Sequence, residues 1–238
     1  MLLDQPSSNL LPASRQLLLV VARHWESRGG QLQRFARDGV DGAWLRVGNP
    51  VAVSLGCSGL AWGRGLYRPV DGVGPEKCEG DGRAPAGIFP ITALFGDGSA
   101  GSRLARAAKL PYFCVTSDLK CVDDPASVHY NHIVDQSRVG GIDWNSGEDM
   151  LRGDDRYALG AVVGCNCDPV LPAAGSCIFL HVWQAPGVPT AGCTALALAD
   201  MMKIAGWLDG AKSPLLVQLP RGAFKRMRVT WGLPDRAD

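Results

Sequence analysis

A histidine and a cysteine lie twelve residues apart, at His181 and Cys193, in the most informative stretch of the sequence. A short apolar run ends at His181, a loop with proline and glycine follows, and Gly192 directly precedes Cys193. The pattern predicts that Cys193 opens an amphipathic helix over Thr194–Asp209, whose N-terminus would favour a thiolate. An imidazole at this spacing can take the thiol proton and later protonate a leaving amine. The stretch therefore predicts a nucleophilic cysteine with a histidine base.

The residues around Cys193 suit the approach of a substrate carbonyl. Gly192 has no side chain there, so the backbone N–H groups of Gly192 and Cys193 are expected to form an oxyanion hole. Trp183 follows His181 by two residues and is expected to form a wall of the cleft. Three arginines are candidates for a bidentate contact to a substrate carboxylate: Arg64, Arg68 and Arg83.

Two motifs, in the same order along the chain, resemble the catalytic domain of the L,D-transpeptidase family of the YkuD type. The stretch from His181 through Thr190 and Gly192 to Cys193 is similar to the family's active-site motif. Arg83–Ile91 is similar to its Thr-Pro-x-Gly-x-Phe-x-Ile strand. The resemblance extends over residues 17–219 and implies a β-sandwich of mixed sheets with peripheral helices.

The resemblance implies an enzyme that acts on the stem peptides of bacterial peptidoglycan, in the periplasm or cell envelope. In that family the cysteine attacks the carbonyl of the L-centre of a diamino acid and expels D-alanine, and the amine of another stem peptide resolves the acyl-enzyme. Carried over, Cys193 is the nucleophile, His181 is the base, and the backbone carbonyl of Val182 orients the imidazole. Three residues are expected to contact the substrate: Arg83, Trp183 and Thr190. No cofactor or metal is expected.

Several departures from the family pattern place the chain in a divergent branch. The loop before Cys193 is short, Ala191 replaces a second histidine, Thr194 stands where arginine or asparagine is usual, and the bulky Val182 and Trp183 follow the histidine. Three alternatives to transpeptidation therefore stay open. Water as acceptor would give an L,D-carboxypeptidase, loss of turnover would leave a wall-binding module, and a different amide substrate would suit a cytoplasmic thiol peptidase or amidase.

The elements that must position these residues are predicted to be mostly strands. Thirty glycines and sixteen prolines are spread over 238 residues, which favours many short strands joined by tight turns in a sandwich or barrel core. The predicted strands are Gln16–Ala22, Gln31–Arg37, Ala43–Val47, Val51–Leu55, Ile88–Ile91, Tyr157–Val163, Cys177–Val182, Leu215–Leu219 and Met227–Trp231. Besides Thr194–Asp209, a helix is predicted over Ser102–Leu110. Residues 1–13 are expected to be a poorly ordered extension and residues 14–238 a single domain.

Composition excludes several other classes of protein. The chain has 46% hydrophobic residues and a formal net charge of +1, which excludes a disordered segment and leaves no surplus of cations for nucleic acid. The apolar run Leu17–Ala22 is too short to span a membrane. Residues 1–12 lack a basic start, so no secretory signal is visible. The oligomeric state stays open.

Eight cysteines fit no standard zinc spacing. Cys114 and Cys121 are the pair best placed for a disulfide if the compartment is oxidising. Cys165 and Cys167 are expected to be separate thiols or to pair with a distant cysteine such as Cys177. A second group, His129 with His132 and Asp135, has metal-like spacing but no evident further ligand, so solvated side chains are the expectation.

Overall fold

The computed structural model of the protein describes residues 11, 13–67, 73–97 and 105–235. The expected extension at residues 1–13 lies almost entirely outside the described residues, as does Arg68. No helix in the described ranges is long and apolar enough to cross a membrane.

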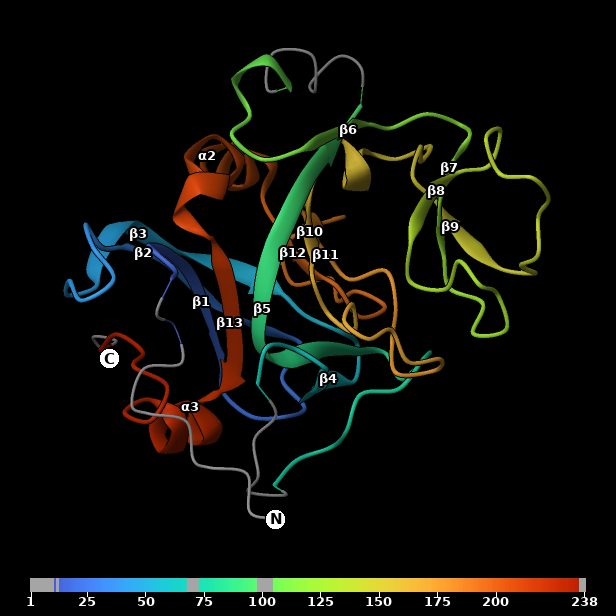
Figure 1. Ribbon diagram of the computed structural model, residues 1–238. Helices are drawn as coiled ribbons and strands as arrows, with labels where there is room; N and C mark the ends of the chain where they lie inside the picture. Colours follow the sequence, from blue (N-terminus) through green and yellow to red (C-terminus); the bar gives the residue numbers. More distant parts are fainter. Residues whose placement is uncertain (1–10, 12, 68–72, 98–104, 236–238) are drawn as a thin grey trace.

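Eight strands close into a barrel, each hydrogen-bonded to two neighbours (Figure 1). Their order around the barrel is β10 (Leu159–Val163), β11 (Phe179–Val182), β12 (Thr194–Leu196), β3 (Leu45–Ser54), β2 (Gly29–Ala36), β1 (Gln16–Ala22), β13 (Leu215–Pro220) and β5 (Arg83–Gly96). The prediction of a mainly β fold with peripheral helices is confirmed. The sheet is a closed barrel, one of the two cores that the strand count favoured, whereas the family resemblance implied a β-sandwich of mixed sheets.

The length of β5 explains the closure. Its residues 87–90 pair antiparallel with β13, and its residues 91–96 pair antiparallel with β10. One strand of 14 residues therefore joins the two ends of the sheet and leaves neither as a free edge. Two short strands extend from the same element: β4 (Gly59–Trp62) runs parallel to its start and β6 (Tyr112–Cys114) parallel to its end.

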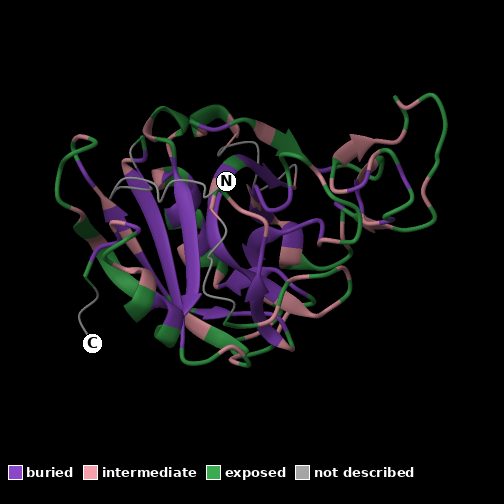
Figure 2. Cartoon of the chain, turned by 60° about the horizontal axis from the view of Figure 1, so that its bottom comes forward, coloured by how far each residue is buried: buried purple, intermediate pink, exposed green. Residues whose placement is uncertain are grey.

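Two helices cover parts of the barrel. The helix α2 (Leu198–Trp207) packs against β10 and β11, and α3 (Arg221–Met227) packs against β13 and β1. All residues of β1 and β13 are buried, because these strands face the barrel interior on one side and covering segments on the other (Figure 2). The resulting core is a rigid frame for the strands that carry the candidate site.

Four predicted elements are corrected by the structure. The predicted strands Ala43–Val47 and Val51–Leu55 form one strand, β3, whose pairing with β2 shifts register where Gly48 adopts a φ of 66°. The predicted strand Met227–Trp231 is wrong, because α3 follows directly on β13 and the chain then continues in turns. Of the predicted helix Ser102–Leu110, residues 105–107 are helical and residues 102–104 lie outside the described ranges.

A separate sheet of three short strands lies beside the barrel, at the right of Figure 1. Its order is β8 (Ile133–Asp135), β7 (Leu119–Val122) and β9 (Gly147–Asp149). A disulfide joins Cys121 of β7 to Cys177, two residues before β11, with 5.9 Å between the Cα atoms. The predicted Cys114–Cys121 pair is therefore wrong, and Cys114 is an exposed free thiol. The side sheet is fixed covalently to the barrel strand that carries His181.

Removing this disulfide is expected to destabilise the protein substantially. The bond closes a loop across a sequence separation of 56 residues, and the chain-entropy model assigns about 4 kcal/mol of unfolding free energy to a loop of that size. Urea denaturation of a Cys121→Ala/Cys177→Ala double variant measures the loss. Cys114→Ala removes an exposed free thiol and serves as the matched control, with an unchanged midpoint. A double variant as stable as the parent protein would contradict the expectation.

Candidate active site

The register of two neighbouring strands brings His181 and Cys193 together. β11 and β12 run parallel, with His181 paired to Ala195. Cys193 lies two residues before Ala195, and side chains two residues apart point to the same face of a strand. Cys193 directly precedes β12, and it lines the same cavity as His181, of about 90 Å³. Ala195, which also lines the cavity, is small enough to leave the space between them open.

The orientation of His181 is set by the neighbouring backbone. Its Nδ1 lies 2.8 Å from the carbonyl oxygen of Val182, the contact that the family resemblance implies. A carbonyl oxygen only accepts, so Nδ1 carries the proton and Nε2 of the neutral ring is left as an acceptor. Burial, together with the nearby Arg156 and Arg152, lowers the pKa of His181 to about 4. The imidazole is therefore neutral near pH 7 and able to accept a proton.

Cys193 is buried as a neutral thiol. Its Sγ accepts a hydrogen bond from the Phe179 N–H at 3.3 Å and donates to the Cys177 carbonyl oxygen at 3.4 Å. Burial, and the negative charge of Glu148, raise its pKa to about 12. A neutral thiol beside a neutral imidazole is the starting state for general-base activation, in which the proton leaves the sulfur as the sulfur attacks.

The predicted helix start at Cys193 is wrong. Residues 194–196 form β12 and pair with β11, and α2 begins only at Leu198. The helix N-terminus is too far along the chain to stabilise a thiolate at Cys193, because the effect of the helix dipole is limited to the first turn. The position of the Cys193 thiol is set by the start of β12 and its pairing with β11.

Thr190 fixes the turn that leads into Cys193. Its hydroxyl donates to the Cys193 carbonyl oxygen at 2.6 Å and accepts from the Gly192 N–H at 3.2 Å. The Gly192 N–H is thus occupied, which corrects the expectation that it is free to bind an oxyanion. Within the described residues, no hydrogen bond uses the Cys193 N–H. This N–H is the remaining donor for a developing oxyanion, and Thr190 also lines the cavity.

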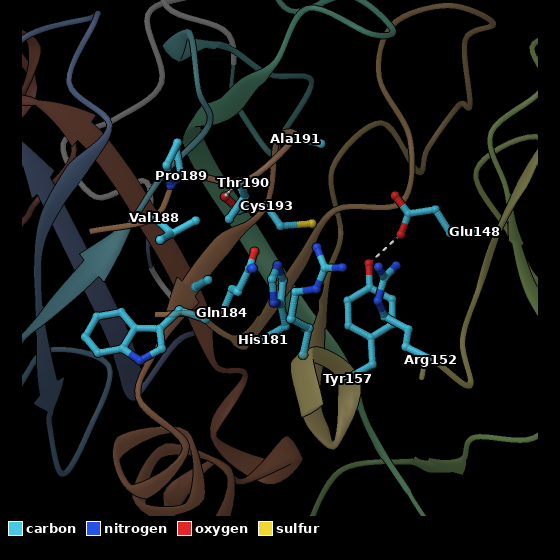
Figure 3. A pocket seen from close by; sticks show the side chains of 13 residues that line it. Glu148, Arg152, Tyr157, His181, Gln184, Val188, Pro189, Thr190, Ala191 and Cys193 are labelled. Atoms are coloured by element: carbon cyan, nitrogen blue, oxygen red, sulfur yellow. Dashed lines mark hydrogen bonds between the residues drawn. The ribbon is translucent and has the colours of Figure 1, made fainter. Parts of the chain in front are cut away.

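The cavity has walls from two distant parts of the chain (Figure 3). One wall comes from the loop after β11 and includes Trp183, as expected, with Gln184, Val188 and Pro189. The opposite wall comes from residues 148–157 and carries most of the charge: Glu148, Arg152, Arg156 and Tyr157. Figure 3 shows Cys193 and His181 between the two walls. The arrangement combines a thiol, a neutral imidazole and ionic groups in one cavity.

Arg83 does not line this cavity. Its guanidinium donates to the Leu60 carbonyl oxygen at 2.9 Å, and its backbone N–H donates to Asp81. Arg83 therefore ties the start of β5 to β4. Arg64, the other described candidate, lines a different cavity with Trp62 and Lys77.

The cationic residues of the cavity are Arg152 and Arg156, which sequence reasoning missed. Both donate to the carboxylate of Asp154. The distance is 3.2 Å from Arg152 Nε and 2.8 Å from Arg156 Nε. The hydrogen bond from Arg156 is the main cause of the lowered pKa of Asp154. Two arginines flanking one aspartate at spacings of two residues are the signal that was available in the sequence. The wall therefore presents two guanidinium groups to the cavity, with Asp154 and Glu148 as their acidic neighbours.

The described residues contain no group of three or more His, Cys, Asp or Glu side chains arranged to hold a metal ion. His129 packs edge-on against Trp144, and His132 Nδ1 bonds to the Tyr130 carbonyl oxygen. Cys165 and Cys167 are free thiols.

Comparison of the chain with protein-family models, with curated proteins and with solved structures finds no match.

Proposed function

We propose that the protein is a cysteine acyl-transfer enzyme that acts on peptidoglycan stem peptides, as an L,D-transpeptidase of a divergent branch. The observation that carries the proposal is that Cys193 lies in one cavity with His181, an imidazole whose Nε2 is left unprotonated by the contact of Nδ1 with the Val182 carbonyl. The order of the two motifs supports the family assignment, and we propose that the barrel is a variant of that family's fold.

In the first half-reaction, Nε2 of His181 takes the proton of Cys193 as Sγ attacks the substrate carbonyl carbon. The carbonyl oxygen becomes an oxyanion, for which the Cys193 N–H is the donor. The tetrahedral centre then collapses, the C–N bond breaks, and His181 gives its proton to the leaving amine of D-alanine. A thioester on Cys193 remains.

In the second half-reaction, an acceptor attacks the thioester and restores the thiol. An amine of another stem peptide gives a cross-link, and water gives the shortened peptide. The guanidinium groups of Arg152 and Arg156 are suited to hold the carboxylate of D-alanine, the role that Arg83 was expected to fill. Action on this substrate places the protein in the periplasm or cell envelope, where its disulfide would persist.

Mass spectrometry of reaction products tests the proposal. The protein is incubated with purified tetrapeptide stems and, separately, with intact peptidoglycan. New bonds between diamino acids would identify a transpeptidase, and tripeptide with free D-alanine would identify an L,D-carboxypeptidase. An unchanged substrate in both incubations would contradict catalysis on peptidoglycan and favour a wall-binding module or a different amide substrate.

A further inference from the structure

Tyr157 links His181 to an acidic side chain from the side sheet. The rings of Tyr157 and His181 meet edge to face, with 5.3 Å between centroids and 76° between planes. The Tyr157 hydroxyl donates to Oε2 of Glu148, which lies on β9 (Figure 3). The imidazole is therefore in contact with a ring that is itself held by a carboxylate.

The hydroxyl of Tyr157 is not needed for the packing of its ring. The ring also contacts Phe95 and Phe179, with centroid distances of 5.4 and 5.6 Å, and a phenylalanine would make the same apolar contacts. Burial raises the pKa of Tyr157, and the charge of Glu148 raises it further, so the hydroxyl stays protonated as a donor. Among the residues that the structure describes, this hydroxyl bonds to the carboxylate of Glu148. The function of the hydroxyl is thus to fix the position of the ring.

Placing Glu148 at this position has an energetic cost. Burial raises the pKa of its carboxyl group, and the nearby Asp123 and Glu79 raise it further. Moving a carboxylate out of water is unfavourable unless hydrogen bonds compensate, and the Tyr157 hydroxyl supplies such a bond. Glu148 pairs directly with Cys121 on β7, so the Cys121–Cys177 disulfide holds its strand against the barrel.

Other contacts restrain Tyr157 and His181 further. The guanidinium carbon of Arg152 lies 5.1 Å from the centre of the Tyr157 ring. The Val182 carbonyl fixes the direction of His181 Nδ1, but a single hydrogen bond leaves the ring free to tilt about it. The edge contact with Tyr157 limits that tilt. Together the two contacts determine where Nε2 lies relative to the Cys193 sulfur.

We propose that Tyr157, held by Glu148, is a positioning residue for the imidazole of His181. The inference rests on the proposed function, because it assumes that His181 acts as the base toward Cys193. A misplaced base slows proton transfer and leaves substrate binding intact, so the effect falls on kcat and not on KM.

Three variants of the pair separate positioning from packing. Tyr157→Phe keeps the ring and removes the hydroxyl, and it is expected to lower kcat by about tenfold to a hundredfold with KM unchanged. Glu148→Ala is expected to have the same effect. Glu148→Gln keeps an oxygen that accepts from the hydroxyl and is expected to retain most of kcat. The double variant Tyr157→Phe/Glu148→Ala is expected to be no slower than either single variant, because the two residues act as one unit.

Tyr130→Phe is the matched control. Tyr130 is a buried tyrosine whose hydroxyl also donates to a glutamate, Glu79, but neither residue lines the cavity. Its variant is expected to keep kcat within about twofold of the parent protein. Unchanged kcat in Tyr157→Phe would overturn the inference. A Glu148→Gln variant as slow as Glu148→Ala would also overturn it, because charge and not the hydrogen bond would then matter.

A second measurement distinguishes failure of this inference from failure of the proposed function. The rate at which iodoacetamide modifies Cys193 is followed by peptide mapping across the pH range, for the parent protein and for each variant. A parent protein that turns over no stem peptide would refute the proposed function. The inference would still predict slower modification of Cys193 in Tyr157→Phe than in Tyr130→Phe, and equal rates in the two variants would refute it independently.

Discussion

Replacing Cys193 with alanine is expected to abolish turnover of stem peptides, with a loss of kcat/KM on the order of 10⁴ or more. No other thiol lines the cavity that holds His181 in the described chain, so no side chain can take over the attack. The Cys193→Ala variant should also form no thioester with the substrate. Mass spectrometry of the intact protein after brief exposure to substrate checks this, because only the parent chain gains the mass of the acyl group.

The buried position of Cys193 makes a folding control necessary. Alanine removes a sulfur that bonds to the backbone of Phe179 and Cys177, so a modest loss of stability is expected. Cys193→Ser keeps those contacts and should be nearly as inactive. Cys167→Ala, at an exposed free thiol outside the cavity, should keep full activity. Residual turnover above a few per cent in a folded Cys193→Ala protein would refute the role of this cysteine.

Replacing His181 with glutamine is expected to lower kcat/KM by about 10²- to 10⁴-fold. Glutamine fills a similar volume and can donate to the Val182 carbonyl, but it cannot accept and return a proton at neutral pH. The thiol would then have to ionise unaided, and its pKa of about 12 leaves very little thiolate. Steady-state kinetics measures the loss, and near-ultraviolet circular dichroism confirms that the variant is folded.

The pH dependence of kcat/KM tests the role of His181 separately. Only the neutral imidazole accepts a proton, so the rate falls as pH drops through the pKa of His181. Since burial lowers that pKa from 6.5 to about 4, the acidic limb of kcat/KM is expected below pH 6.5, toward 4. The limb should disappear in His181→Gln. An acidic limb that persists in the variant, or a rate loss of less than about tenfold, would show that His181 is not the base.

The sequence was most informative where local pattern and tertiary structure agree. β1 was predicted to the residue, because its apolar run is interrupted on both sides by polar and charged residues. The direction of His181 toward the Val182 carbonyl followed from the family motif, since both groups lie within two consecutive residues. The geometry of such segments is determined by residues that are adjacent in the sequence.

The errors arose where distant contacts override local preference. Residues 194–196 directly precede an amphipathic helical pattern and were predicted to be part of that helix. They form a strand instead, because they hydrogen-bond to β11 on one side and β3 on the other. The Cys121–Cys177 bond joins residues 56 positions apart, and no spacing rule selects that pair among eight cysteines. The charged wall of the cavity follows from that bond, because the side sheet brings Glu148 to the barrel. The place of Glu148 in that wall could therefore not be predicted from the sequence, whereas the spacing of Arg152 and Arg156 around Asp154 was visible there.

The strand pairing that places Cys193 near His181 also has a consequence for how far the loop between them can vary. Residues 183–189 form the loop between the end of β11 and Thr190. The backbone of Thr190 is hydrogen-bonded to Leu55 and Cys57, so both ends of this loop are held by the barrel. Insertions or deletions in that segment would reshape one wall of the cavity and leave the distance between sulfur and imidazole unchanged. Closing a longer loop costs little free energy, since each doubling of its length adds about 0.6 kcal/mol. Changes in the length or sequence of this loop would thus alter the cavity wall without moving Cys193 or His181.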